Sequence, residues 1–168
     1  IRDSINTAIL SGDAMLIRAY QSLEVYPTDI FQNLTKLLSK TAIQLCEGQQ
    51  LDIDFETQYL VSQNQYEEMI RLKTAVLIGC ALKMGAILGC ASKEDTKAIY
   101  DFGVQLGLAF QLQDDYLDAF GDQSTFGKKI GGDILENKKT ILYHLAIKKA
   151  SAKQADLLNS MLKDNITL

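Results

Sequence analysis

This sequence has one proline, one histidine and no tryptophan, and the first two scarcities limit the structures and sites that are possible. One proline in 168 residues favours long helices, because a proline inside a helix costs about 3 kcal/mol. The single histidine, His144, cannot form a metal cluster with other histidines, so we interpret it as a structural or surface residue. The three cysteines, Cys46, Cys80 and Cys90, are an odd number without metal-ligand spacing. We therefore expect them to be buried thiols in a reducing cytosol.

Long hydrophobic runs and an excess of positive charge are also missing. The uncharged apolar runs are too short to span a membrane, and no signal peptide or polybasic anchor is visible. The formal net charge is −4 and the pI is about 5.0, which argues against a nucleic-acid-binding protein, since such proteins usually carry a basic face. We therefore expect a cytoplasmic protein with no nucleic-acid partner and no membrane span. An acidic protein with an anionic substrate would need metal ions and a local basic cluster.

The spacing of the apolar residues predicts an all-α protein. Apolar residues make up 47% of the sequence and recur at helical spacing nearly throughout, with no alternating pattern that would support a sheet. No linker or repeat divides the chain, so we expect residues 1–168 to form a single domain, a bundle of long helices. The predicted helices cover residues 1–21, 29–50, 63–90, 93–121, 134–150 and 152–164.

Particular residue types mark where these helices begin and where loops interrupt them. The candidate N-terminal caps are Thr28, Ser62 (in a capping box with Gln65) and Ser92. Residues 51–61 are expected to form a loop, and the glycine- and lysine-rich residues 123–133 a mobile loop. Gly103 and Gly107 lie inside a predicted helix, where each costs about 1 kcal/mol relative to alanine. Their presence indicates close packing against another helix.

Three carboxylates lie within five residues near the end of the predicted helix 93–121, at Asp114, Asp115 and Asp118. Residues three and four apart share one face of a helix, so these like charges repel unless a cation lies between them. Mg²⁺ is usually held by one or two carboxylates with water and substrate phosphates, and lysines downstream suit phosphate oxygens. The sequence therefore predicts a Mg²⁺–diphosphate site built on helices. A solvated acidic helix face is the alternative, whereas an EF-hand is excluded because Tyr116 occupies a loop position that needs an oxygen ligand.

The aspartate segment resembles the second aspartate-rich motif of the trans-isoprenyl diphosphate synthases, the polyprenyl synthetase family that includes farnesyl and geranylgeranyl diphosphate synthases. Further features of that family occur in the same order along the chain. They are Ala8–Asp13, Gly48-Gln49 followed by Asp52, Lys73-Thr74, Phe110-Gln111, Gly127-Lys128, Gly131–Ile134 and Lys138. The resemblance implies an isoprenoid synthase-type bundle of long antiparallel helices.

The resemblance also implies a Mg²⁺-dependent prenyltransferase that condenses isopentenyl diphosphate with an allylic prenyl diphosphate. The allylic diphosphate ionises to a carbocation, the double bond of isopentenyl diphosphate attacks it, a proton is lost and pyrophosphate is released. Metal ions and cationic side chains would stabilise the charge that develops on the leaving diphosphate. The pyrophosphate itself is the expected proton acceptor, which would explain why no catalytic histidine is needed.

Roles for individual residues follow from the same resemblance. The implied metal ligand is Asp114, with Asp115 and Asp118 in support. The implied diphosphate-binding lysines are Lys73, Lys128 and Lys138, with Lys129 and Lys139 as adjacent alternatives. Thr74 and Gln111 are implied to lie beside the carbocation, and Gln49 near the substrate cavity.

The family carries a first Asp-Asp-x-x-Asp motif and an Arg-Arg pair upstream of the segment equivalent to Ala8–Asp13, and neither is present in this chain. We therefore expect a single partial polyprenyl synthetase domain, incomplete at its N-terminal side, and expect this fragment alone to be inactive. The alternative is a non-catalytic regulatory or partner subunit of a prenyl diphosphate synthase. A terpene cyclase is disfavoured because its Asn-x-x-x-Ser-x-x-x-Glu motif is not found. Since family members are commonly homodimers, a homodimer is expected.

Overall fold

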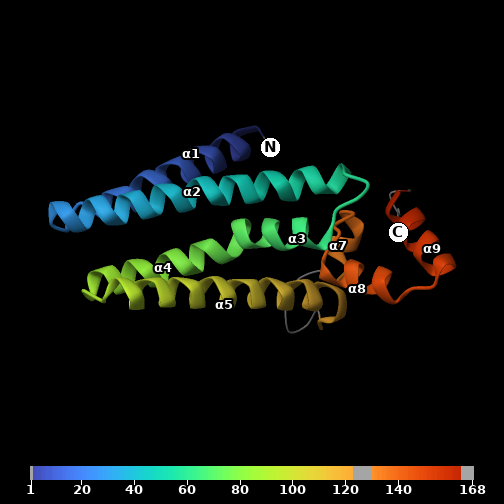
Figure 1. Cartoon of the computed structure of the whole chain (residues 1–168). Helices are drawn as coiled ribbons and strands as arrows, with labels where there is room; N and C mark the ends of the chain where they lie inside the picture. Colours follow the sequence, from blue (N-terminus) through green and yellow to red (C-terminus); the bar gives the residue numbers. More distant parts are fainter. Residues whose placement is uncertain (1, 123–129, 164–168) are drawn as a thin grey trace.

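The computed structural model describes residues 2–122 and 130–163, and these residues form helices without strands (Figure 1). The all-α prediction is therefore confirmed. The helices are α1 (Arg2–Gln21), α2 (Thr28–Thr57), α3 (Gln63–Ile70), α4 (Val76–Leu88), α5 (Lys93–Phe120), α7 (Gly132–Leu135), α8 (Ile141–Lys149) and α9 (Ala152–Lys163). A π-helical turn, η1 (Arg71–Ala75), joins α3 to α4. None of the described helices is long and apolar enough to cross a membrane.

The long helices run antiparallel to one another in chain order. α1, α2, the continuous rod of α3, η1 and α4, and then α5 reverse direction at each connection (Figure 1). The short helices α7, α8 and α9 gather at one end of the bundle, where α2 finishes, α3 begins and the C-terminal part of α5 arrives. Segments far apart in the sequence therefore meet at this end, and the aspartate segment of α5 lies among them.

Two of the predicted helix starts are confirmed. Ser62 Oγ accepts a hydrogen bond from the Gln65 backbone N–H at 3.3 Å, and the Gln65 side chain accepts one from the Ser62 backbone N–H at 2.9 Å, which completes the capping box. Ser92 Oγ caps α5 by accepting from the Asp95 backbone N–H at 3.0 Å. The prediction for Thr28 is wrong. The preceding proline occupies the N-cap position without a side-chain cap bond, so Thr28 is already the first helical residue.

One predicted boundary in the first half of the chain is also wrong, and one predicted helix is confirmed but contains an internal irregularity. Residues 51–57 continue α2 instead of forming a loop, because Asp52 and Phe55 are buried on the face of α2 that packs against α3 and η1. The predicted helix 63–90 is continuous in direction but contains the π-helical turn η1. Such turns insert one extra residue and often occur at functional sites.

The segment after α5 differs from its prediction as well. The predicted helix 134–150 is divided into α7 and α8, because Asn137 adopts a left-handed conformation with φ of 57°, which ends a helical run. Within the predicted loop 123–133, residues 123–129 lie outside the described residues, and Gly132 and Asp133 begin α7.

Glycines allow α5 and α2 to approach the rod of α3, η1 and α4 closely. A Cβ atom added to Gly107 would lie 2.5 Å from the Cα of Ala75, and one added to Gly103 would lie 2.7 Å from the Cα of Gly79. The close packing predicted for these two glycines is confirmed. A Cβ atom on Gly48 would meet the backbone of η1 even more closely. The turn η1 is therefore seated between α2 and α5, with no room for a side chain at either contact.

The cysteines are placed differently from one another. Cys80 is buried in α4, as predicted, but Cys46 and Cys90 are exposed, so the prediction of buried thiols is wrong for these two. Cys46 lies on the outer face of α2, and Cys90 lies in the tight turn after α4 with φ of 55°. All three are free thiols.

Candidate active site

A cavity lies at the end of the bundle where α7 and the loop before α8 meet α2, α3 and α5. Its volume is about 190 Å³, far above the ~15 Å³ that a single water molecule needs. Its polar and charged lining residues are Asp52, Tyr66, Lys73, Gln111, Asp114, Asp115, Asp133, Lys138, Lys139 and Thr140. The fold thus brings together five of the predicted site residues, which are spread over 66 positions of the sequence from Lys73 to Lys138.

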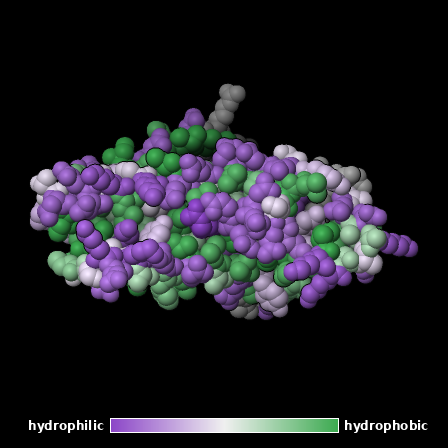
Figure 2. Space-filling view, in the orientation of Figure 1, coloured by the Kyte–Doolittle hydropathy of each residue, from purple (hydrophilic) through white to green (hydrophobic). Residues whose placement is uncertain are grey.

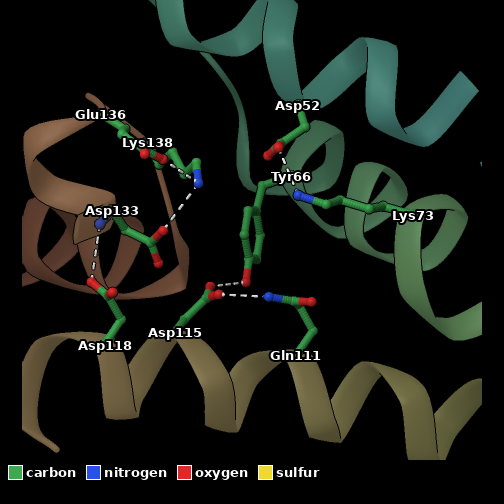
Figure 3. Close-up of polar contacts among 9 residues, drawn as sticks. All are labelled: Asp52, Tyr66, Lys73, Gln111, Asp115, Asp118, Asp133, Glu136 and Lys138. Atoms are coloured by element: carbon green, nitrogen blue, oxygen red, sulfur yellow. Dashed lines mark hydrogen bonds and ion pairs between the residues drawn. The ribbon is translucent and has the colours of Figure 1, made fainter. Parts of the chain in front are cut away.

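Asp115 is turned toward the interior of the protein. It is only 5% exposed, and its two carboxylate oxygens accept hydrogen bonds from the Tyr66 hydroxyl and, at 3.1 Å, from Gln111 Nε2 (Figure 3). Burial raises the pKa of the Asp115 carboxyl, although both hydrogen bonds work in the opposite direction. Burial and the hydrogen bond to Asp115 raise the pKa of Tyr66 far above its usual range. The Tyr66 hydroxyl therefore keeps its proton and remains a hydrogen-bond donor.

Asp118 is held by the short helix α7. Its carboxylate accepts a hydrogen bond from the Asp133 backbone N–H at 3.0 Å (Figure 3). Its backbone carbonyl accepts one from the Gly131 N–H at 2.7 Å. Asp118 lies outside the lining of the cavity described above and contributes to a neighbouring apolar cavity between α5, α8 and α9. The three aspartates therefore have three different surroundings, and of them only Asp114 and Asp115 line the first cavity.

The carboxylates do not form a complete metal cage. Within residues 2–122 and 130–163, no three carboxylate, imidazole or thiol groups are arranged to hold a metal ion by themselves. The donor set nevertheless fits Mg²⁺, which proteins commonly bind through one or two carboxylates plus water and substrate phosphates. Asp114 would supply such a carboxylate from α5, while Lys73 and Lys138, which line the same cavity, would face the phosphates.

Lys73 reaches the cavity from η1 and forms an ion pair with Asp52. Its Nζ lies 2.6 Å from an Asp52 carboxylate oxygen, and the Asp52 side chain is only 9% exposed (Figure 3). Gly48, one turn before Asp52, lets the backbone of α2 touch the backbone at Lys73. The position of the Lys73 ammonium is therefore set from two sides, by the close approach of the two backbones and by a buried carboxylate.

Thr74 and Gln111 form a neutral pair beside this lysine. Thr74 Oγ1 donates a hydrogen bond to Gln111 Oε1 at 2.9 Å, and Gln111 Nε2 donates to Asp115. The pair connects η1 to α5 at the place where these elements are in close contact. Both side chains remain uncharged, which suits a position beside a positive charge better than a cationic group would.

Lys138 and Lys139 are adjacent in sequence but face different surroundings. Lys138 Nζ bonds Glu136 at 2.6 Å and Asp133 at 3.2 Å; burial disfavours its charged form, but these two carboxylates outweigh burial and raise the pKa of the Lys138 ammonium. Lys139 is 7% exposed, and its Nζ donates to the backbone carbonyls of Phe55 and Glu56 at 3.1 and 3.4 Å. Lys139 thus caps the C-terminal end of α2, where a cation is favourable.

This difference gives a first prediction. Replacing Lys139 by methionine is expected to lower the free energy of unfolding by about 1–3 kcal/mol, because one buried and one partly buried carbonyl lose their donor. Replacing Lys138 by methionine is expected to cost about 1 kcal/mol or less, since its ion pairs are partly solvated. Urea denaturation of the two variants checks this. A Lys138→Met variant that is less stable than Lys139→Met would contradict the assignment of Lys139 as the structural lysine.

Some predicted residues lie elsewhere. Gln49 is exposed on α2 and does not line the cavity, and Lys128 and Lys129 are outside the described residues. Conversely, sequence reasoning gave Tyr66 no role. The signal that could have found it is its position seven residues before Lys73, which is two helical turns and therefore nearly the same face.

Comparisons with known proteins show which family this chain resembles over nearly its whole length. The model of the polyprenyl synthetase family matches residues 3–167 of the chain. The short chain isoprenyl diphosphate synthase of Methanothermobacter thermautotrophicus is 38% identical over 156 residues, which are 92% of this chain and 48% of that protein. The chain spans about half the length of the curated relatives that it matches.

Solved structures show the same fold. The crystal structure of a geranylgeranyl pyrophosphate synthase has a TM-score of 0.90 and 54% sequence identity, and the match covers 96% of this chain and 50% of that one. The polyprenyl synthase from Caulobacter crescentus CB15, complexed with calcium and isoprenyl diphosphate, has a TM-score of 0.77 and 27% identity, covering 95% of this chain and 53% of that one. The likeness therefore extends over nearly the whole of the chain.

Proposed function

The chain belongs to the polyprenyl synthetase family, and from that premise we propose that it carries the second aspartate motif of a trans-prenyltransferase. The proposed reaction condenses isopentenyl diphosphate with an allylic prenyl diphosphate. Relatives named as short chain isoprenyl and geranylgeranyl diphosphate synthases support this substrate class. Because the chain spans about half the length of these relatives, the activity is proposed for the protein at its full natural length and not for these residues alone.

The observation that carries the proposal is the meeting of Lys73, Lys138 and Asp114 at one cavity. An ammonium group has three N–H donors, so Lys73 retains donors for phosphate oxygens while it bonds Asp52. Lys138 approaches the same space from the other side of the cavity, held by Asp133. We propose that these two lysines, with Lys128 from the undescribed segment, bind the diphosphate groups.

Mg²⁺ is the proposed metal, with Asp114 as its direct ligand, Asp118 acting through water and Asp115 in support. When bound, the ion would supply electrostatic stabilisation of the leaving diphosphate. The Caulobacter crescentus relative supports a divalent cation, since its structure holds calcium together with isoprenyl diphosphate. On this proposal Asp114 orients the diphosphate through the metal, and the lysines hold the oxygens that gain charge.

The neutral pair of Thr74 and Gln111 is proposed to lie beside the allylic carbocation. Their oxygen atoms offer partial negative charge, and neither group is a strong nucleophile that would capture the cation. The cavity also has an apolar wall of Phe55, Met69 and Ile70, which keeps water away from that side. Water exclusion matters because water would convert the cation to an alcohol.

A homodimer in the cytoplasm is proposed as the working form. α1 exposes a run of large apolar side chains, including Ile9, Leu10, Met15 and Ile17, each more than half exposed. Figure 2 shows hydrophobic side chains along the edge of the molecule formed by α1. Such a surface supports association with a second copy, because monomers rarely leave large contiguous apolar patches in water. Free cysteines support a reducing compartment.

The proposal is tested by calorimetric titration of the chain with inorganic pyrophosphate, with and without Mg²⁺. We expect Mg²⁺ to be required for tight binding and Lys73→Met to weaken it about 10- to 100-fold, which corresponds to one lost charge-assisted contact of roughly 1.5–3 kcal/mol. The matched control is Lys97→Met on α5, whose ammonium also pairs with an aspartate, Asp101, at 2.5 Å, but on the exposed surface.

Turnover is measured separately, with isopentenyl and dimethylallyl diphosphates and the full-length protein. Pyrophosphate binding that is independent of Mg²⁺ and unchanged in Lys73→Met would contradict the proposed site. Mg²⁺-dependent binding without any turnover would favour the alternative, a non-catalytic partner subunit.

A further inference from the structure

The hydroxyl group of Tyr66 has no part in the reaction proposed above, yet it lies at the centre of the site. We infer that Tyr66 is a positioning residue: by holding Asp115, it sets the orientation of the Gln111 amide and, through it, of the Thr74 hydroxyl. Asp115 then acts mainly through Gln111 and not as a direct metal ligand. The inference rests on the proposed function and adds Tyr66 to it as a positioning residue.

A connected series of hydrogen bonds joins Tyr66 to Thr74. Tyr66 donates its O–H to one oxygen of Asp115, Gln111 Nε2 donates to the other at 3.1 Å, and Thr74 Oγ1 donates to Gln111 Oε1 at 2.9 Å. The four residues come from α3, η1 and α5, so this series of hydrogen bonds crosses the contact between these elements. Figure 3 shows the Tyr66 ring between the Asp52–Lys73 pair and the Asp115–Gln111 pair, with its hydroxyl directed at Asp115.

This series of hydrogen bonds runs in one direction. Gln111 presents its NH₂ group to Asp115, since Gln111 Nε2 donates and a carboxyl oxygen of Asp115 accepts. The Gln111 carbonyl oxygen then faces Thr74, and the Thr74 hydroxyl must donate its proton to it. The Thr74 oxygen is left with lone pairs for its other neighbours. The orientation of the Gln111 amide beside Asp115 thus determines that Thr74 offers partial negative charge, which is the polarity that a nearby carbocation requires.

The Tyr66 ring is held firmly by its neighbours. Tyr66 is 2% exposed and packs with Phe55, Val61, Met69 and Ile70 in the buried cluster beside the cavity. Its ring also lies 5.9 Å from the ring of His144 on α8, centroid to centroid. Because the ring is packed between the buried cluster and His144, its hydroxyl group is held in one position. The carboxylate that it bonds is consequently kept on the inner side of α5, whereas side chains of adjacent helical residues such as Asp114 point about 100° away.

The test compares Tyr66→Phe with Tyr20→Phe in the full-length protein. Each substitution removes one phenol hydroxyl; that of Tyr20 bonds Ser39 Oγ at 3.0 Å between α1 and α2, away from the cavity. We expect Tyr66→Phe to lower kcat for prenyl transfer about 10- to 100-fold, as for a misplaced reacting group, with little change in KM or in the Mg²⁺ concentration for half-maximal activity. We also expect more of the allylic substrate to be released as alcohol. Tyr20→Phe should match the parent protein.

A double-mutant cycle separates positioning from a general loss of structure. If Tyr66 acts through this series of hydrogen bonds, Thr74→Val combined with Tyr66→Phe will lower kcat little more than Thr74→Val alone. Both substitutions remove the same feature, the oriented Thr74 hydroxyl. Independent, multiplicative losses would overturn the inference. Should Tyr66→Phe fail to fold, Asp115→Asn supplies the second measurement: a lower kcat with an unchanged Mg²⁺ requirement is expected, and a large rise in that requirement would mark Asp115 as a metal ligand and overturn the inference.

The outcomes also distinguish this inference from the proposed function. A full-length parent protein that shows no prenyl transfer would overturn the proposed function and the inference together. A parent protein that turns over while Tyr66→Phe behaves like Tyr20→Phe would overturn the inference alone.

Discussion

Asp114→Asn is expected to lower Mg²⁺-dependent prenyl transfer by the full-length protein about 10²- to 10³-fold. The substitution keeps the shape of the side chain but removes the negative charge that we propose binds the metal. Loss of one preorganised electrostatic contact to the leaving group typically costs this much, because it acts where charge develops in the transition state. Asp114 is partly exposed on α5 and lines the cavity, so its replacement should not disturb the buried core.

Asp101→Asn is the matched control for this prediction. Asp101 lies on the same helix, and its exposed carboxylate pairs only with Lys97 among the ion pairs of the described residues. Its loss should leave the rate within about two-fold of the parent, since exposed i,i+4 pairs contribute only about 0.3–0.5 kcal/mol to stability. Steady-state rates over a series of Mg²⁺ concentrations check both variants. Equal activity of Asp114→Asn and the parent at low Mg²⁺ would exclude Asp114 as the ligand.

Among the glycines of the described residues, Gly48 is expected to tolerate a methyl group least, and Gly48→Ala should lower the free energy of unfolding by about 1–3 kcal/mol or more. The added Cβ would collide with the backbone nitrogen of Lys73 and lie 2.7 Å from the backbone carbonyl carbon of Leu72. Both are backbone atoms, so the collision cannot be relieved by rotating a side chain. The helix α2 or the turn η1 must move, and Lys73 moves with it.

Pyrophosphate affinity should therefore fall in Gly48→Ala together with stability, and urea denaturation with calorimetric titration measures the two. Gly85→Ala is the control, because Gly85 lies within α4 and an added Cβ there meets nothing within 4 Å. Alanine is favoured over glycine inside a helix by up to about 1 kcal/mol, so Gly85→Ala should be slightly stabilised. A Gly48→Ala protein as stable as the parent would mean that α2 and η1 are not in backbone contact.

The sequence was sufficient where the physical cause is local. The period of the apolar residues predicts helices, and the capping residues Ser62 and Ser92 place the starts of α3 and α5, because each cap joins residues only three apart. Gly103 and Gly107 pointed to a close contact, since a glycine inside a helix needs a compensating gain. The aspartates with the lysines downstream, together with the resemblance, indicated the chemistry of the site.

Only the tertiary structure distinguished the individual aspartates and lysines from one another. Asp114, Asp115 and Asp118 are the same residue type on one helix, but only packing against α3 and α7 gives them different partners. Lys138 and Lys139 are likewise adjacent residues of one type. Lys138 pairs with two carboxylates after the left-handed turn at Asn137, whereas Lys139 caps the end of α2. The contacts responsible join residues 49 positions apart for Tyr66 and Asp115, and 84 positions apart for Phe55 and Lys139. Local periodicity and capping arise within a few residues, whereas burial and the hydrogen bonds that accompany it exist only once distant helices are packed together.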